Sequence, residues 1–372
     1  MTLNKKSVIA LLSAGIGLSF VMNANSFEDS WSKPIKQHAQ QIDDAALSQS
    51  LKQYASEYER LFKKQGYIGQ KLNIPPIQVV SEGVFFVKGA LMWGTLENHG
   101  LNNNITAVEL DSGVFVYNTG SNPAVAYSFH QALKKHTNKP VQWLAAENYQ
   151  SHANLGGSYW HAQGVKHIYS QKQAADFWHK KGFDNAIRRV NQYNPFLAEA
   201  AQNIGEQYLT FEDKLIVNSG TGDEFHLINF GGGHTPTMTG AFIPSKNILF
   251  TGDLGFVERL PGLLDDSSYS EWMTSFEAMV NYAKKHSPDV NKMLVIPGHG
   301  GATTLPELIA QTYDYFEDLK TTVDQAINQG LSGSEFEKAV DMPNYHHRPM
   351  YNQLYLRNAQ SVYEERTAGS VD

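Results

Sequence analysis

"GGHTPTMTGAFIPSKNILFTGDLGF", residues 232–256, is the stretch that decides the fold. A strand-like apolar run before residue 231 stops at the glycines that precede His234, and a second run stops at Gly252, just before Asp253. The same arrangement returns in "VIPGHGG", residues 295–301, which carries His299. A rigid strand end with a glycine turn lets the backbone approach an ion closely, so three such turns in order predict a metal site.

The residue types at these turns suit zinc. Imidazole and carboxylate groups are ordinary zinc ligands, and a bound zinc ion lowers the pKa of water towards 7, which makes it a nucleophile. The chain has no cysteine. A zinc site in this protein must therefore be built from histidines and carboxylates, and disulfides are excluded.

The pattern around these turns predicts a sandwich of two sheets with helices outside. Short β-branched or aromatic runs bounded by glycine, asparagine or aspartate predict strands, and apolar residues three or four positions apart predict helices. Strands are expected within residues 83–91, 104–120, 139–146, 165–170, 214–220, 224–230, 240–253 and 292–300. Helices are expected at residues 43–66, 122–136, 269–286, 305–330 and 350–366. Because the two types alternate, the fold class is α/β.

The segment 232–256 followed by "VIPGHGG" resembles the metallo-β-lactamase-fold superfamily, over about residues 76–303. The resemblance implies a four-layer αββα sandwich with a zinc site at one edge of its sheets. It implies that His234 binds the first metal, that Asp253 bridges two metals and that His299 binds the second. "FTGDLGFVERLPGLLDDSSYSEWM", residues 250–273, the helices after "PGHG" and the late "YLRNAQSVYEE" are similar to one branch, the exported quinoprotein-relay or sulfur-oxidation-type hydrolases.

"ENYQSHANLGG", residues 147–157, stands where this family carries His-x-His-x-Asp-His followed by two glycines. Gly156 and Gly157 match the downstream half. Counting back from Gly156 without a gap places Tyr149, Ser151, Ala153 and Asn154 at the four ligand positions of the motif. The first three of these residues are poor ligands. One inserted residue instead gives Asn148, Gln150 and His152 at the first three ligand positions.

A register with one deletion is preferred, because it keeps a true ligand. It puts Gln150 at the first position, His152 at the second and Asn154 at the aspartate position, with the last histidine absent. Neutral amides bind zinc far more weakly than imidazole or carboxylate. On this register Asn154→Asp is expected to raise metal affinity or the hydrolytic rate. Asn118, in "VFVYNTG", also replaces an aspartate that the family usually has.

The predicted metal ligands are His152, His234, Asp253 and His299, with Asn154 as a weak fifth. Asp253 and Glu147 are the catalytic candidates; Glu147 could act as a general base, replace a lost ligand, or only cap a strand end. The site is expected to hold one zinc ion, with two if further groups contribute and none if the site is vestigial. The predicted function is metal-dependent hydrolysis of an ester, amide, lactone or sulfate-type bond in a small-molecule substrate. The alternative is an inactive protein of this fold that binds a small molecule or a protein.

"NYHHRPMY", residues 344–351, places Arg348 beside two histidines and between tyrosines. Such a cluster could bind an anionic substrate at a pocket rim, or it could be an ordinary surface loop.

The N-terminus has the order of a secretory signal. Two lysines precede a 14-residue apolar run, and small residues at Ala24 and Ser26 follow, which predicts cleavage near Ser26 and a periplasmic or secreted protein. The expected organisation is a signal peptide (1–26), a helical segment (27–75), the sandwich (76–303) and a C-terminal helical extension (304–372). The 372-residue chain has a net charge of -7, which gives nucleic-acid binding little support, and no membrane anchor is expected after cleavage. Nothing in the sequence sets the oligomeric state.

Overall fold

The computed structural model describes residues 33–65, 71–194, 197–198, 200–220 and 222–368. The predicted signal peptide lies outside these residues, so cleavage near Ser26 and export stay predictions. In the described part of the chain, no helix has both the length and the apolar character needed to cross a membrane.

Two compact units make up the chain, Met1–Lys63 and Lys64–Asp372. The first contains α2 (Lys33–Ala39) and most of α3 (Ala45–Gln65), which is the helix expected at 43–66. Asp44 caps α3, because its side chain accepts hydrogen bonds from the amides of Ala46 and Leu47. The Ser48 hydroxyl donates to the carbonyl oxygen of Ala39, and this contact holds the two helices together.

The second unit begins with a mixed sheet of seven strands in sequence order. The first four strands pair antiparallel, and the last three continue the sheet in parallel. Parallel strands need a crossover between them, and helices supply it here. The strands are β1 (Gln78–Ser81), β2 (Val84–Val87), β3 (Ile105–Glu109), β4 (Val114–Tyr117), β5 (Val141–Ala146), β6 (His167–Gln171) and β7 (Leu209–Phe211).

A second sheet of five strands has the order β12-β11-β10-β9-β8. Its members pair antiparallel except β11 and β12, which run parallel with α9 between them in the chain. The strands are β8 (Lys214–Asn218), β9 (Glu224–Asn229), β10 (Thr239–Ile243), β11 (Ile248–Phe256) and β12 (Leu294–His299).

The two sheets pack face to face through alternate residues of their strands. In β9, Phe225 and Leu227 join the core between the sheets, whereas Ile228 joins the core on the opposite face. Phe115 of the first sheet stacks on Phe225 at 4.4 Å between ring centroids. This alternation is what a strand buried on both faces requires.

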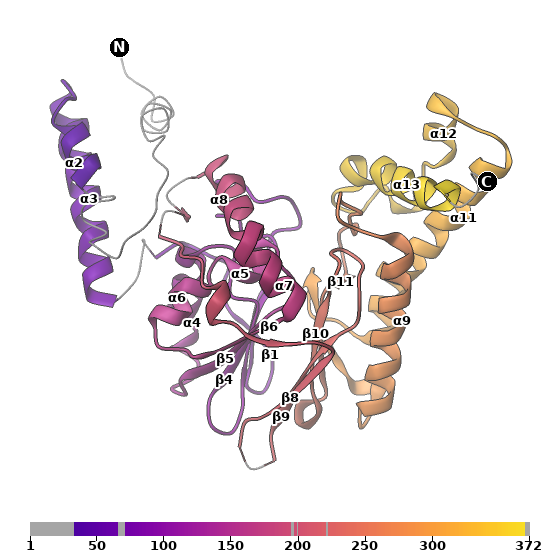
Figure 1. Ribbon diagram of the computed structural model, residues 1–372, viewed down its shortest axis with the longest axis horizontal. Coiled ribbons are helices and arrows are strands. Elements are labelled where there is room, and N and C mark those ends of the chain that lie inside the picture. The colour runs from indigo at the N-terminus through magenta and orange to yellow at the C-terminus, as the bar shows by residue number, and fades with distance from the viewer. Residues whose placement is uncertain (1–32, 66–70, 195–196, 199, 221, 369–372) are drawn as a thin grey trace. The chain divides into compact units, whose positions relative to one another are not determined.

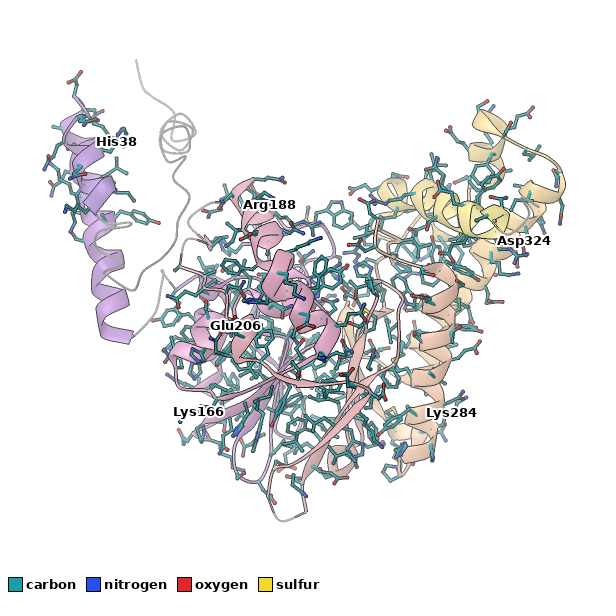
Figure 2. The ribbon with its side chains drawn as sticks, in the orientation of Figure 1. His38, Lys166, Arg188, Glu206, Lys284 and Asp324 are labelled. Atoms are coloured by element: carbon teal, nitrogen blue, oxygen red, sulfur yellow. The ribbon has the colours of Figure 1, made fainter. Side chains whose placement is uncertain are left out.

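Helices cover the outer faces (Figure 1). The first sheet is covered by α4 (Pro123–Leu133), α5 (Ser151–Asn154), α6 (Gly157–Ala162) and α7 (Lys172–Phe177), with α8 (Phe183–Asn191) following. On the second sheet lie α9 (Tyr269–His286) and α10 (Leu305–Leu308). Of the later helices, α13 (Tyr351–Ala368) packs on α9 and α11 (Asp314–Asn328), and α12 (Gly333–Ala339) packs on α11. The outward face of α9 carries charged side chains such as Lys284 (Figure 2). The expectation of a four-layer αββα sandwich is confirmed.

One detail of the second sheet differs from the sequence expectation. β11 continues through Asp253 to Phe256 instead of ending before it, and its register with β12 shifts on either side of Gly252. Gly252 has a φ of +54°, a left-handed conformation that favours glycine. Because of this bulge, the Asp253 side chain departs from the regular alternation of side chains between the two faces of the sheet, although the strand continues.

Candidate metal centre

Asp253 lies at the centre of the candidate site and is fully buried. At the Gly252 bulge, the backbone amide of Asp253 donates to the Oε2 atom of Glu147, at 2.7 Å. A Cβ atom on Gly252 would lie 1.7 Å from that same oxygen. A Cβ on Gly298, in β12, would lie 2.5 Å from Asp253 Oδ1. Gly252 and Gly298, one from each quoted motif, are therefore required by the close packing around this carboxylate.

Three histidines from separate elements converge on Asp253. The Nε2 atoms of His152 and His234 lie 3.5 and 3.6 Å from Oδ2, and Nε2 of His299 lies 3.2 Å from Oδ1. His152 comes from α5, His234 from the loop between β9 and β10, and His299 from the end of β12. The structure thus brings together the four residues that the sequence analysis placed in one metal site.

The donor set fits a metal ion. Two ligand atoms held at about 2.0–2.2 Å from one tetrahedral ion lie roughly 3.3–3.6 Å apart, which matches the separation between each imidazole and Asp253. Among the described residues, the group whose ligand atoms all lie within 4.8 Å of one another is Glu147, His152 and Asp253, so one ion bound by all three histidines requires the imidazoles to move closer together. Asp253 Oδ2 is buried and has no hydrogen-bond partner. The Nδ1 atom of His234 lies 3.0 Å from the carbonyl oxygen of Gly262, which can only accept, so Nδ1 carries the proton and Nε2 keeps its lone pair. These are the groups that an ion between the imidazoles and the carboxylate would use.

Burial sets the protonation of the imidazoles. It lowers the pKa of His234, and it lowers the pKa of His299 to about 4, with the charge of Arg259 adding to the effect. Burial would also lower the pKa of His152, but Asp253 and Glu147 raise it above its usual value. Burial would raise the pKa of Asp253, but the three imidazoles hold it well below its usual range. His234, His299 and Asp253 are thus held in the forms that bind metals, a neutral imidazole and an ionised carboxylate, whereas the raised pKa of His152 favours its protonated form.

Glu147 is the second buried carboxylate of the cluster. Its Oε1 atom lies 2.6 Å from His152 Nε2, and a ligand atom from each of Glu147, His152 and Asp253 lies within 4.8 Å of the others. Burial and the charge of Asp253 raise the pKa of Glu147 to about 7, although the hydrogen bond with His152 acts against them. A distance of 2.6 Å is that of a hydrogen bond and is too short for two ligands on one ion.

Asn103 holds the two carboxylates together, and the sequence analysis missed it. Its Nδ2 donates to Asp253 Oδ1 at 2.9 Å and to Glu147 Oε1 at 3.2 Å. Asn118 donates in turn to the Oδ1 atom of Asn103. The only signal for Asn103 in the sequence is a run of three asparagines before a strand, which turn chemistry explains equally well.

The structure places Asn154 apart from this cluster. Its Nδ2 donates to the carbonyl oxygens of Asn148 and Gln150, at 2.7 and 2.9 Å, and its Oδ1 accepts from the Tyr208 hydroxyl at 3.1 Å. Both ends of the amide are therefore used in holding the segment before α5. The expectation that Asn154 is a weak metal ligand does not fit this placement.

A cavity of about 440 Å³ opens over the cluster. Asp253 and all three histidines line it, together with residues that the sequence analysis did not single out, among them Trp93, Arg189 and Arg259. Glu147 is fully buried and is not one of the lining residues that the structure describes. The general-base role expected for Glu147 does not fit this position, because a general base must reach the reacting group directly or through one water.

Arg348, which the sequence suggested as an anion-binding residue or part of a surface loop, takes neither position. It is buried, and its guanidinium donates to the carbonyl oxygens of Gln311 and Arg259. Arg348 therefore supports the wall of the cavity from behind.

Solved structures similar to this chain are metallo-β-lactamases. The chain is similar to the metallo-β-lactamase DIM-1 (17% identity, 66% of this chain and 99% of the other, TM-score 0.49). It is also similar to a metallo-β-lactamase from Pontibacter korlensis (17% identity, 65% and 98%, TM-score 0.49) and to FIM-1 from Pseudomonas aeruginosa in a mono-zinc form (18% identity, 67% and 98%, TM-score 0.49). No protein-family model and no curated protein matches the sequence. The two packed sheets and their outer helices form a four-layer αββα sandwich; the narrower branch suggested by the sequence stays a prediction.

Proposed function

We propose that this protein is a metal-dependent hydrolase that acts on a small-molecule substrate, with one zinc ion held by His152, His234, Asp253 and His299. The observation that carries the proposal is the approach of three imidazole Nε2 atoms to the buried carboxylate of Asp253, whose Oδ2 atom has no other partner. A buried, unpaired carboxylate oxygen is destabilising unless a cation or a donor reaches it.

Zinc bound at such a site supplies Lewis acidity and lowers the pKa of water, which is the chemistry of ester, amide, lactone and sulfate-type hydrolysis. His234 is held in its binding tautomer by Gly262, and Asp253 is held ionised by the imidazoles around it. Glu147 acts as a positioning residue in this proposal: it fixes the backbone of Asp253 and the ring of His152 without lining the cavity.

One observation favours the alternative, a protein that keeps the cavity only to bind a ligand. The hydrogen bond between His152 and Glu147 satisfies His152 without any metal. In that case zinc would have to compete with a proton for the same nitrogen atom.

Metal content of the purified protein, prepared without chelator, separates the two functions. About one zinc per chain is expected for the wild type, and loss of the metal is expected for His234→Ala. His226→Ala is the matched control: His226 is also buried, but it contacts Glu224 and Tyr282, away from the cluster. A panel of nitrophenyl ester, lactone, anilide and sulfate substrates then tests hydrolysis in the same three proteins.

Absence of zinc from the wild type, or equal zinc in His234→Ala, would sink the hydrolase proposal and leave the binding protein. Two zinc ions per chain would mean that Glu147 completes a second site instead of positioning the first.

A further inference from the structure

A second cavity adjoins the one over the metal ligands. It has a volume of about 340 Å³. Its lining comes from the start of α5, from the loop that carries Asp266, and from the crossover formed by α7, a π-helical turn (Trp178–Gly182) and α8. The candidate metal ligands line the first cavity and not the second, but five residues line both: Gln150, Ser151, Arg189, Gln192 and Asp266. The two cavities are therefore neighbouring parts of one depression.

One face of α8 supplies polar side chains to the second cavity. Its residues follow the spacing i, i+3, i+4 and i+7, which places them on one side of a helix. The π-helical turn before α8 contains an extra residue per turn, so it helps to set which side of α8 faces the cavity; such turns occur frequently at functional sites. The four residues on this face are Asn185, Arg188, Arg189 and Gln192.

The two arginines of this face carry positive charge that no described carboxylate neutralises. Arg188 donates from Nη2 to the Oδ1 atom of Asn185, and within the described residues neither Arg188 nor Arg189 forms an ion pair. The acidic residue in the described wall of the second cavity is Asp266, whose Oδ2 atom accepts from the Tyr149 hydroxyl at 2.8 Å. The wall is therefore locally positive, although the chain has a net charge of -7. A concave surface of one sign attracts the opposite charge more strongly than a flat one does.

Aromatic rings form an apolar part of the same wall. Tyr149 and Phe177 both line the cavity, and their ring centroids lie 4.1 Å apart. Gly182 allows the crossover to approach this pair, because a Cβ atom added to it would lie 3.3 Å from the carbonyl oxygen of Tyr149. An apolar surface beside a few charged groups is the usual composition of a site for a small organic molecule.

We infer that the second cavity binds the far end of an elongated substrate, an organic anion whose terminal oxyanion is held by Arg188 and Arg189 while its scissile bond lies over the metal ligands. The inference rests on the proposed function, because it assigns the substrate class of the same depression. The planar N–H groups of a guanidinium match the paired oxygens of a carboxylate or a similar oxyanion. Arg189 and Gln192 line both cavities, so the space between the two ends of such a substrate is continuous.

Binding to the metal-free protein tests the anion site separately from hydrolysis. The probe is the monoanilide of suberate, and its terminal carboxamide is the neutral match; each is titrated by calorimetry into chelator-treated protein. With no metal present, the carboxylate cannot owe its binding to zinc. We expect the acid to bind at least about tenfold more tightly than the carboxamide, because a charge-assisted hydrogen bond is lost in the latter.

Arg188→Gln is expected to weaken the binding of the acid by about tenfold and to leave the carboxamide nearly unchanged. Arg188 is exposed and lines the second cavity but not the first, so this variant should fold normally and leave the metal ligands untouched. Arg188→Lys keeps the charge but not the planar fork, and its loss should be smaller. Lys166→Gln is the control: it removes one exposed positive charge far from Arg188 in the same unit, and binding should stay within about twofold (Figure 2).

The length of the substrate is tested with the zinc-loaded protein. Nitrophenyl monoesters of succinate, adipate and suberate are compared with neutral nitrophenyl alkanoates of equal chain length. Arg188→Gln should raise the KM of the longer anionic esters by about tenfold with little change in kcat, and it should leave the succinate ester and all neutral esters unaffected. A loss of stability alone would lower the rates of all esters together.

Equal binding of the acid and the carboxamide, unchanged binding in Arg188→Gln, or an equal loss in Lys166→Gln would overturn the inference. Binding that depends on Arg188 in a protein that takes up no zinc would support the anion site while the hydrolase proposal fails. Zinc uptake and ester hydrolysis that do not depend on Arg188 would mean the reverse.

Discussion

At the scale of single residues, the site depends on groups too small or too common to stand out in a sequence. His234, Asp253 and His299 were recognisable because each stands at a glycine turn, and His152 because its segment resembles a family motif. Asn103 and Arg259 were not, because a lone asparagine or arginine in a loop is ordinary. Asn154 was misplaced for a similar reason: an amide is compatible both with a lost aspartate and with a loop-holding side chain, and only the contacts with Asn148 and Gln150 separate the two.

Gly252→Ala is expected to lower the free energy of unfolding by far more than the backbone strain of an alanine at this positive φ would explain. Strain at positive φ costs about 1–2 kcal/mol, and the clash with Glu147 Oε2 should bring the total loss to at least about 4 kcal/mol. Gly333→Ala is the matched control, since Gly333 has a φ of +53° and a Cβ added to it would meet no atom within 4 Å. Urea unfolding measures both variants. Equal losses would mean that the packing around Asp253 is looser than described.

Asn154→Asp, which the sequence register predicted would raise metal affinity, is now expected to destabilise the protein. A carboxylate cannot donate to the two carbonyl oxygens that the amide serves, so about 2–4 kcal/mol should be lost at pH 7. Zinc content should stay unchanged. Asn352→Asp, on the exposed face of α13, should be nearly neutral in the same urea titration. Higher zinc affinity in Asn154→Asp would instead support the one-deletion register, in which Asn154 stands at the aspartate position of the motif.

At the scale of elements, most strands and helices were predictable because their periodicity reflects burial. The helix at 269–286 is α9, with the predicted bounds, because Ser268 caps it and a histidine in its last turn precedes proline. β11 was predicted to stop at Gly252, and the structure carries it on to Phe256. A glycine next to an aspartate usually indicates a turn, and only the pairing with β12 shows that it is a bulge inside a strand.

The contact between α4 and α6 predicts a pH dependence of stability. Burial, with Lys134 adding, lowers the pKa of His130 to about 4, and its Nδ1 atom lies 2.7 Å from the Tyr159 hydroxyl. In the unfolded chain the same histidine takes up a proton near pH 6.5. Between these two pKa values the unfolded state binds more protons, so stability falls as the pH drops below about 6.5, and the full loss of about 3 kcal/mol is reached below pH 4.

The difference in free energy of unfolding between pH 7 and pH 5 measures this effect. His130→Gln lacks the titrating group, so its loss between the two values should be smaller than that of the wild type by about 2 kcal/mol. Lys135, which is exposed and is not among the causes of the lowered pKa of His130, offers the control Lys135→Gln, whose pH dependence should follow the wild type closely. An identical pH dependence in His130→Gln and the wild type would show that His130 is not held neutral by the fold.

At the scale of the whole sandwich domain, the C-terminal helices reach into the site. Asn358 on α13 is buried; its Nδ2 donates to the carbonyl oxygen of Pro261, and its Oδ1 accepts from the amide of Leu263. The loop between these contacts carries Gly262, which sets the tautomer of His234. The sequence predicted the helices of this extension but not their link to the metal ligands, because contacts between distant segments leave no periodic signal.

Asn358→Ala should lower the free energy of unfolding by about 3–4 kcal/mol, because it leaves buried partners unsatisfied, including the hydroxyl of Tyr315. It should also weaken zinc binding, although Asn358 touches none of the ligands. Asn352→Ala, on the same helix but exposed, should change the unfolding free energy by less than about 0.5 kcal/mol. If Asn358→Ala destabilises the protein but leaves its zinc affinity unchanged, the contacts of α13 do not contribute to metal binding.

The tie between α13 and the loop around Gly262 has a consequence for how such a protein can diversify. The candidate metal ligands and the wall of the cavity are held by different parts of the chain, the strand ends and α5 on one side and the late helices on the other. Substitutions in the last helix, α13, can change the shape of the cavity wall around Arg259 while every histidine stays in place. New substrate preferences can therefore arise in this architecture from positions that no inspection of the ligand motifs would mark as specific.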